Sequence, residues 1–296
     1  MTQPYPGQFQ PGPYQPVPYQ PVLPRFRSLR TVAIVSMVLM GLSVVAAIIQ
    51  CVLLWRSYDQ VKRLVYGLLS DAELERGARS VAGTGPLLDL LGYLLIGTAV
   101  AFLLWLWRAR DNVDFLHSPF APRPVMPQYP PHRHAPGWVI GSWFCPVVQF
   151  WYPFQIVEDV VRASRPPARP LGRVRELLYG WWATWTGFWV IMVGGGTVAV
   201  VGFIVWVVRL VQATDNGAGG YVDVYDLQDF MVHVALGVDI GFTVATVLLI
   251  VSGVAMVLLM RQIGDWQDER MAPPPAVQDH LPPQYAPRPG FPTYGR

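Results

Sequence analysis

Two aspartates stand inside otherwise apolar stretches of this sequence, and they are the side chains best placed to do chemistry. Asp239 lies about two helical turns inside the apolar run 234–260, Asp89 lies near the start of the run 87–107, and His233 immediately precedes the later run. A carboxylate in such a run is costly and normally faces a helix-bundle interior or a water-filled cavity. These three residues form a candidate polar site for a cation or a proton. The alternative is that each is hydrated at the edge of the apolar layer.

Histidines between the apolar runs are a second set of ligand-type side chains. His117, His132 and His134 lie among prolines, without the acids or thiols at fixed spacing that metal sites use. We expect ordinary loop histidines, with no metal site and no cofactor. The sequence also lacks the P-loop, zinc-protease, nucleophile-elbow and dinucleotide-binding motifs. No enzymatic activity is therefore expected.

The composition is that of an integral membrane protein. Of 296 residues, 52% are hydrophobic and 14% are charged, whereas soluble domains carry about 25% charged residues. The net charge is +3, and the basic residues are scattered between apolar blocks, so nucleic acid is not an expected partner. The partner implied by this composition is the lipid bilayer. Cys51 and Cys145 are expected on opposite sides of it, too far apart for a disulfide.

Four windows predict an all-α fold with four transmembrane helices. Each is long enough to cross a hydrocarbon core about 30 Å thick, which requires about 20 helical residues. The windows are 31–55, 87–107, 181–208 and 234–260, within a membrane domain spanning 29–263. The glycine run Gly194–Gly196, followed by Gly202, in the third window predicts a surface where another helix packs closely.

The two ends of the chain have a different composition from the membrane domain. Residues 1–28 and 264–296 are rich in proline and contain few aliphatic side chains. Proline at this density favours extended, solvated backbone, so both ends are predicted to be disordered tails. Repeated Tyr-Gln-Pro triplets in the first tail are a candidate docking motif for cytoplasmic protein partners.

The placement of arginines along the chain predicts how the protein is oriented in the membrane. Arginines are abundant before the first span and between the second and third spans, whereas the last loop holds Arg209 beside several aspartates. Because basic residues mark cytoplasmic loops, both termini are predicted to be cytoplasmic in a multi-pass protein of the cell membrane. The first loop departs from this pattern, since it carries five basic residues against four acidic ones.

The connection between the second and third spans carries the most distinctive motifs of the chain. A Trp-Arg-Ala-x-x-Asn run is followed by a Gly-Trp-x-x-Gly-x-Trp-Phe-x-Pro run and then by a Tyr-Pro-Phe run. The motif residues are Trp107, Arg108, Asn112, Trp138, Trp143, Phe144, Pro146 and Pro153. This arrangement resembles the bacterial membrane family known as domain of unknown function 4328. The resemblance implies a multi-span membrane protein and no established activity.

The segment 138–161 predicts an interfacial or re-entrant hairpin. It is too apolar for a cytoplasmic loop, but Pro146 and Pro153 divide it into pieces too short to span. Arginines flank it on both sides, and a full crossing would place one arginine group on the wrong side. Hydropathy alone leaves a fifth span as the alternative.

These observations leave two functions open. Flexible tails on a bundle without catalytic motifs favour a non-enzymatic scaffold or accessory protein. The alternative is a small cation- or proton-coupled transporter or channel that uses Asp239. Association into a homo-oligomer is compatible with either function.

Overall fold

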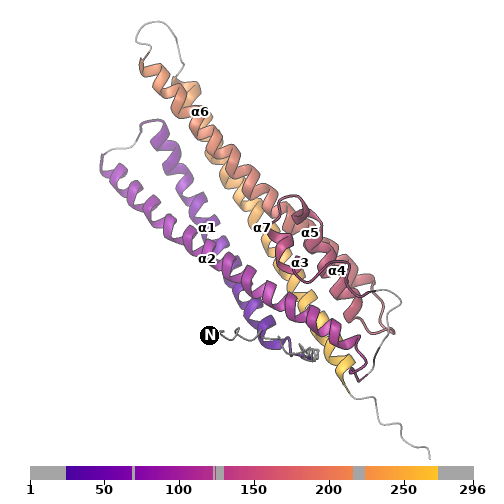
Figure 1. Cartoon of the computed structure of the whole chain (residues 1–296). Helices are drawn as coiled ribbons and strands as arrows, with labels where there is room; N and C mark the ends of the chain where they lie inside the picture. Colours follow the sequence, from indigo (N-terminus) through magenta and orange to yellow (C-terminus); the bar gives the residue numbers. More distant parts are fainter. Residues whose placement is uncertain (1–24, 69–70, 123, 125–129, 216–223, 273–296) are drawn as a thin grey trace, which may run out of the picture.

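The computed structural model describes residues 25–68, 71–122, 124, 130–215 and 224–272, and all its regular elements are helices (Figure 1). In chain order they are α1 (Arg30–Val65), α2 (Asp71–Leu116), α3 (Trp138–Phe144), the 3-10 turn η1 (Val148–Phe150), α4 (Tyr152–Ser164), α5 (Gly172–Trp189), the π-helical η2 (Val190–Gly195), α6 (Gly196–Asp215) and α7 (Val224–Met271). Helices α5, η2 and α6 continue one another without a break.

The predicted all-α membrane fold is confirmed. Within the described residues, four helical segments are long and apolar enough to cross a membrane, and each contains one of the predicted windows. These segments are Arg30–Val65, Gly85–Leu116, Gly172–Gln212 and Tyr225–Met271.

The four long helical segments alternate in direction, so the first and last described residues lie at the same end of the bundle (Figure 1). Helices α1 and α2 pack side by side, and α7 packs along both α1 and α5. We call the end where α1 begins and α2, α4 and α7 finish the basic end, because Arg27, Arg162, Arg169 and Arg270 lie there. Helices α1 and α6 finish at the opposite end.

The core is thickest at the basic end. Fully buried Trp105 and Leu106 of α2 meet Val157 of α4 and Leu259 and Ile263 of α7 in one apolar cluster. A smaller cluster lies nearer the middle of the bundle. There, alanines of α1 and α7 let the backbones approach closely.

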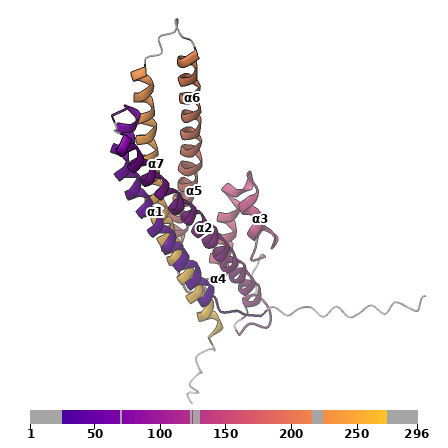
Figure 2. The ribbon, with the colours of Figure 1, turned by 90° about the vertical axis from the view of Figure 1, so that its left-hand side faces the viewer.

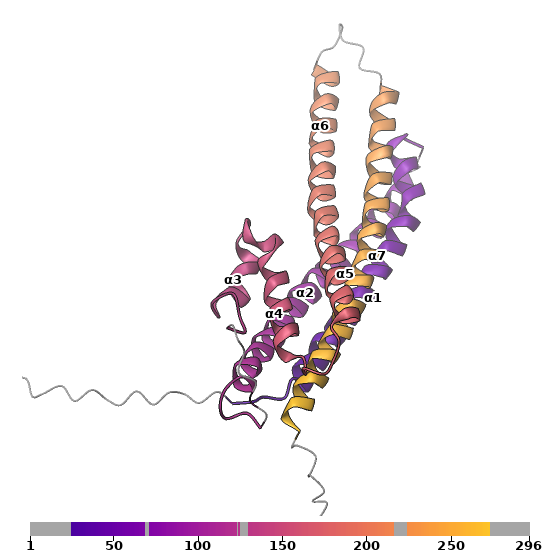
Figure 3. The same cartoon turned by 90° about the vertical axis from the view of Figure 1, so that its right-hand side faces the viewer.

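The segment 138–161 is a hairpin, as predicted, and lies against the basic-end half of α2 (Figures 2 and 3). Its helices have 7, 3 and 13 residues, against about 20 for a span, so the alternative of a fifth span is not supported. Pro146 follows the end of α3, and Pro153 occupies the first turn of α4, where the missing N–H costs nothing. The turn between them exposes Phe144 and Val147 by 73% and 67%. Such a tip suits an apolar environment.

The glycine run at Gly194–Gly196 is not a packing surface, contrary to the prediction. All three residues are exposed, and a Cβ built on any of them would meet nothing within 4 Å. The run falls at the junction of η2 and α6. Close packing occurs instead at Gly187, where a Cβ would lie 3.2 Å from Leu248 Cδ1 of α7. Of the predicted patch, Gly202 does pack on α7, since a Cβ there would lie 3.4 Å from Val234 Cγ2. Glycines in the sequence show where two helix backbones could approach closely, but the rotation of each helix about its axis decides which glycines face a neighbouring helix.

The domain boundaries need correction at both ends. Helix α7 runs to Met271, so residues 264–271 are helical, although the tail was predicted to begin at 264. At the other end, residues 25–28 are part of the described structure, and the backbone of Arg27 is hydrogen-bonded to α2. Residues 25–28 and 264–271 are fixed by hydrogen bonds to helices that are distant in the sequence. The amino-acid composition of a segment does not reveal such contacts. The rest of both predicted tails, 1–24 and 273–296, lies outside the described residues.

Candidate functional site

A buried side-chain amide lies at the centre of the basic end. Asn112 of α2 is fully buried, and its Oδ1 accepts a 2.8 Å hydrogen bond from the backbone N–H of Arg27. Its Nδ2 donates to the carbonyl oxygen of Arg27 at 2.8 Å and to Oε1 of Gln267 at 2.9 Å. The side-chain amide of Asn112 therefore pairs with both the N–H and the carbonyl of Arg27, as the backbone of a neighbouring β-strand would. The same amide also hydrogen-bonds α7 through Gln267.

Gln267 and Arg270 complete the network from α7. The Nε2 group of Gln267 donates to the Ala109 carbonyl at 3.0 Å and to Ser164 Oγ at 2.8 Å. Arg270 donates to carbonyls at the ends of α4 and α2. These carbonyls have no partner within their own helices, so the guanidinium acts as a C-terminal cap for two helices. We call Asn112, Ser164, Gln267 and Arg270 the polar clamp.

A second set of ion pairs fixes the proline- and histidine-rich loop before α3. Arg133 donates through Nε to Asp159 Oδ1 at 2.7 Å and through its backbone N–H to Asp159 Oδ2 at 2.9 Å. Its Nη2 also lies 2.7 Å from Glu158 Oε2, and Arg162 pairs with the other oxygen of Glu158 at 2.6 Å. Both carboxylates are nearly buried. Pairing them with arginines offsets their desolvation, and the fork geometry of Arg133 sets the loop position.

The histidines of this loop are engaged in ordinary contacts. His134 stacks on Tyr152 with ring centroids 4.1 Å apart, and its Nε2 lies 2.7 Å from Gln155 Oε1. Its carbonyl accepts a hydrogen bond from the guanidinium of the buried Arg110. His132 Nε2 lies 3.2 Å from Asp114 Oδ1. Among the residues that the structure describes, no group of three or more His, Cys, Asp or Glu side chains could hold a metal ion.

The motif residues divide between the clamp, the hairpin and their interface. Asn112 is central to the clamp, whereas Trp107 and Arg108 are half-buried one helical turn earlier. Trp138 meets Tyr152 edge-on at 5.1 Å, and Trp143 meets Phe102 of α2 edge-on at 5.5 Å. Phe144, Pro146 and Pro153 shape the turn of the hairpin.

The predicted membrane site is split by helix rotation. Asp239 is 6% exposed and faces the bundle interior, whereas Asp89 and His233 are exposed. His233 Nδ1 lies 2.7 Å from the Asp229 carbonyl of its own helix. The two carboxylates and the histidine therefore do not form one site.

Other polar side chains lie close to Asp239 along the chain or in space. Thr243 donates to the Asp239 carbonyl at 2.7 Å and accepts a hydrogen bond from Trp55 Nε1 at 2.9 Å. The thiol of Cys51 lies 3.3 Å from the same hydroxyl, and the adjacent Gln50 is fully buried with no partner for its amide among the described residues. The nearby cavity, lined by Ala47, Leu91 and Thr246 among others, has a volume of about 20 Å³. That volume accommodates about one water molecule.

Sequence reasoning missed Gln50, Arg133, Ser164, Gln267 and Arg270. One signal was available for the last two. Met256, Met260, Ile263, Gln267 and Arg270 recur at spacings of three and four, so the buried face of α7 continues past the apolar window.

Comparison with known protein families identifies a relationship for most of the chain. A family model described as a domain of unknown function, DUF4328, matches residues 66–265. No curated protein and no solved structure matches the chain.

Replacing Asn112 by alanine is expected to lower stability by about 3 kcal/mol, because Gln267 and the Arg27 peptide lose buried partners. In a domain of this size, the loss corresponds to a Tm about 6–12 °C lower, measured on the detergent-purified protein. The control Asp268→Ala removes an exposed side chain beside Gln267 and should change Tm by less than about 2 °C. The double variant Asn112→Ala/Gln267→Ala should be less damaging than the sum of the single variants. Additive losses would mean that the two amides act independently.

His117 makes stability depend on pH. Burial lowers the pKa of its imidazole below the ordinary value, although Nδ1 lies 2.8 Å from the Val113 carbonyl oxygen. Between the folded and unfolded pKa values the unfolded chain binds more protons, so stability falls as the pH drops below about 6.5. We expect His117→Asn to flatten the decline of Tm between about pH 7.5 and pH 5. An unchanged decline in His117→Asn would contradict the assignment.

Proposed function

The chain belongs to the DUF4328 family, a family of unknown function whose model covers residues 66–265, and on this premise we propose that it is a non-enzymatic scaffold or accessory protein. In this proposal the four spans anchor it in the cell membrane with both termini in the cytoplasm. The basic end then faces the cytoplasm and presents the binding surface for protein partners.

The observation that carries the proposal is the position of Arg133. Proline-rich loops of this composition are usually mobile, but the described residues 130–137 are tied to α4 by the contacts of Arg133 with Asp159 and Glu158. A surface that is already ordered loses less conformational entropy when a partner binds. These residues lie at the end of the bundle where α1 begins and α7 ends.

The distribution of polar contacts supports the same proposal. In the middle of the described bundle, a cavity of about 20 Å³ among α1, α2, α5, η2 and α7 is lined mainly by apolar side chains. The described side chains with several hydrogen-bond or ion-pair partners, such as Asn112, Arg133 and Gln267, lie instead at the basic end, where they hold a surface in place.

Photo-crosslinking from the loop tests the scaffold function. A photoreactive residue at the exposed Ala135 should capture reproducible partner proteins in living cells. Arg133→Lys keeps the charge that the buried carboxylates need but loses the fork geometry, so partner capture should fall about tenfold. Arg175→Lys, a matched change at an exposed arginine of α5, should leave capture unchanged.

Two results would contradict the scaffold function. One is the absence of any reproducible crosslinked protein with the wild-type loop. The other is an identical capture pattern in Arg133→Lys when its Tm equals that of wild type.

A second candidate function rests on Asp239. Its carboxylate faces the other helices, and Thr243, Trp55 and Cys51 surround the same stretch of α7 with polar groups. The fully buried Gln50 adds an amide without a partner in the described part of the chain. Intramembrane polar groups of this kind commonly mark ion or proton pathways. This arrangement favours a cation- or proton-coupled transporter over a second scaffold element.

The transporter function predicts flux that depends on this carboxylate. In proteoliposomes, Asp239→Asn should reduce a pH-dependent cation or proton flux by about tenfold or more, because the amide holds no charge and releases no proton. Asp89→Asn, which changes the exposed carboxylate, should retain the flux. Wild-type flux equal to that of protein-free liposomes, or full flux in Asp239→Asn, would exclude this function.

A further inference from the structure

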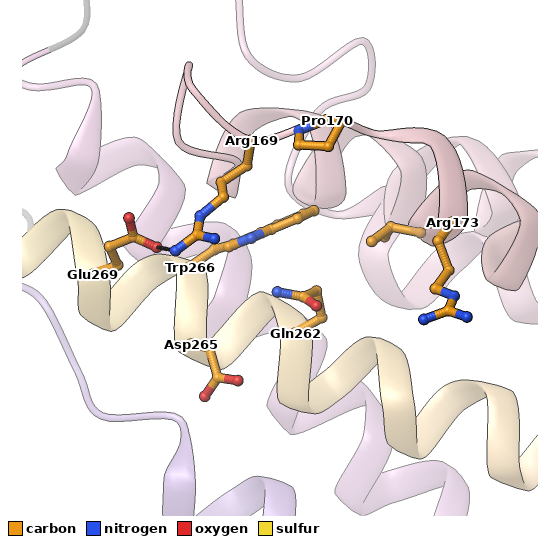
Figure 4. Close-up of a pocket in the computed structure, with 8 residues that line it drawn as sticks. Arg169, Pro170, Arg173, Gln262, Asp265, Trp266 and Glu269 are labelled. Atoms are coloured by element: carbon orange, nitrogen blue, oxygen red, sulfur yellow. Dashed lines mark ion pairs between the residues drawn. The ribbon is translucent and has the colours of Figure 1, made fainter.

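A cavity of about 360 Å³ opens between the start of α5 and the last turns of α7, at the basic end (Figure 4). This volume lies within the range of small-molecule sites, about 300–1,000 Å³. Its polar and aromatic lining consists of Arg169, Arg173, Gln262, Asp265, Trp266 and Glu269. Arg169 comes from the segment that leads into α5, Arg173 comes from the first turn of α5, and the other four come from α7.

The lining carries balanced charge, and part of it is unpaired. Arg169 lies beside the Trp266 ring in Figure 4 and pairs with Glu269 at 3.5 Å. Arg173 and Asp265 are exposed and make no hydrogen bond or ion pair within the described part of the chain. A cation and an anion that are both accessible to a ligand therefore line the same cavity. A ligand that carries both signs of charge complements this pair better than a simple anion does.

The cavity lies just beyond the apolar part of the bundle. The third and fourth predicted spans have their basic-end limits at Trp181 and Met260, so Arg173 and Asp265 fall within about two turns of the hydrocarbon boundary. Trp266 is nearly buried and forms an apolar wall at this level. Charged groups at this depth meet the headgroups of lipids.

An exposed apolar stripe leads into the cavity along α7. Val251, Val254 and Leu258 are exposed by 47%, 56% and 43%. They precede Gln262 and Asp265 at spacings of three and four, which places all five on one face of the helix. The ligand that fits this surface has a charged head in the cavity and a hydrocarbon portion along the stripe.

We propose that this cavity binds the headgroup of a phospholipid that carries phosphoethanolamine. Arg173, assisted by Arg169, holds the phosphate, since guanidinium forks match phosphate oxygens. The carboxylate of Asp265 and the side-chain carbonyl oxygen of Gln262 accept hydrogen bonds from the primary ammonium. The acyl chains run along Val251, Val254 and Leu258.

The chemistry of the lining distinguishes this headgroup from related ones. A choline headgroup has no N–H to donate to Asp265, and a glycerol headgroup has no cation to pair with it. Soluble phosphoethanolamine has the charges but lacks the hydrocarbon that the stripe accommodates. The binding therefore depends on both the two charges and the chains.

Native mass spectrometry of the full-length, detergent-purified protein tests the proposal. The probes are phosphatidylethanolamine, phosphatidylcholine and phosphatidylglycerol with identical acyl chains. We expect phosphatidylethanolamine to bind about tenfold more tightly than the other two lipids. The variant Arg173→Gln/Asp265→Asn should remove this preference. The matched variant Arg175→Gln/Asp268→Asn, which changes one arginine and one aspartate outside the cavity, should retain it.

Three results would overturn the proposal. The first is equal binding of the three lipids or a preference for the anionic or the choline lipid. The second is a preference that survives in Arg173→Gln/Asp265→Asn. The third is full displacement of the lipid by an equal concentration of soluble phosphoethanolamine, which would show that the headgroup binds without the apolar stripe.

Discussion

The hydrogen bond between the side-chain amides of Asn112 and Gln267 is the interaction on which the arrangement of the basic end depends. Lipid is as apolar as the helix surfaces, so apolar contact alone gives little preference for one register of two spans over another. A buried amide does give such a preference, because a shift of one residue leaves its donors and acceptor without partners. The two amides join α2 to α7 across 155 residues of chain. Their remaining hydrogen bonds fix the Arg27 backbone and the end of α4.

The rest of the basic end builds on this register. With α2 and α7 fixed, the end of α4 lies beside them, and Arg270 caps α2 and α4 together. The hairpin is then held at its base by the clamp and at its side by aromatic contacts to α2. The loop before α3 contacts α4 through Arg133, which pairs with the carboxylates of Asp159 and Glu158. Each of these contacts requires the helices that it joins to be in this arrangement.

The arginines of the basic end have two different roles, which cannot be told apart by counting arginines in the sequence. Arg133 at the surface and the buried Arg270 satisfy carboxylates or carbonyls of the protein itself. Arg169 and Arg173 line a cavity at the edge of the apolar bundle. The opposite half has a sparser design, in which α6 packs against α7 and exposes valines such as Val198 and Val200 to the surroundings. Among the described residues, the network formed by Asn112, Gln267 and Arg270 and the ion pairs of Arg133 both lie at the basic end.

The sequence by itself determined the four spans, the hairpin and the grouping of arginines. Hydropathy, proline positions and charge are local properties, and summing them along the chain is enough to place these features. The tertiary structure decided which way each helix faces and which distant residues meet. Rotation turned Asp239 inward and Asp89 outward, left Gly194–Gly196 without a neighbour, and buried Gln267 against Asn112. These outcomes depend on the packing of helices far apart in the chain, and no local window contains that information.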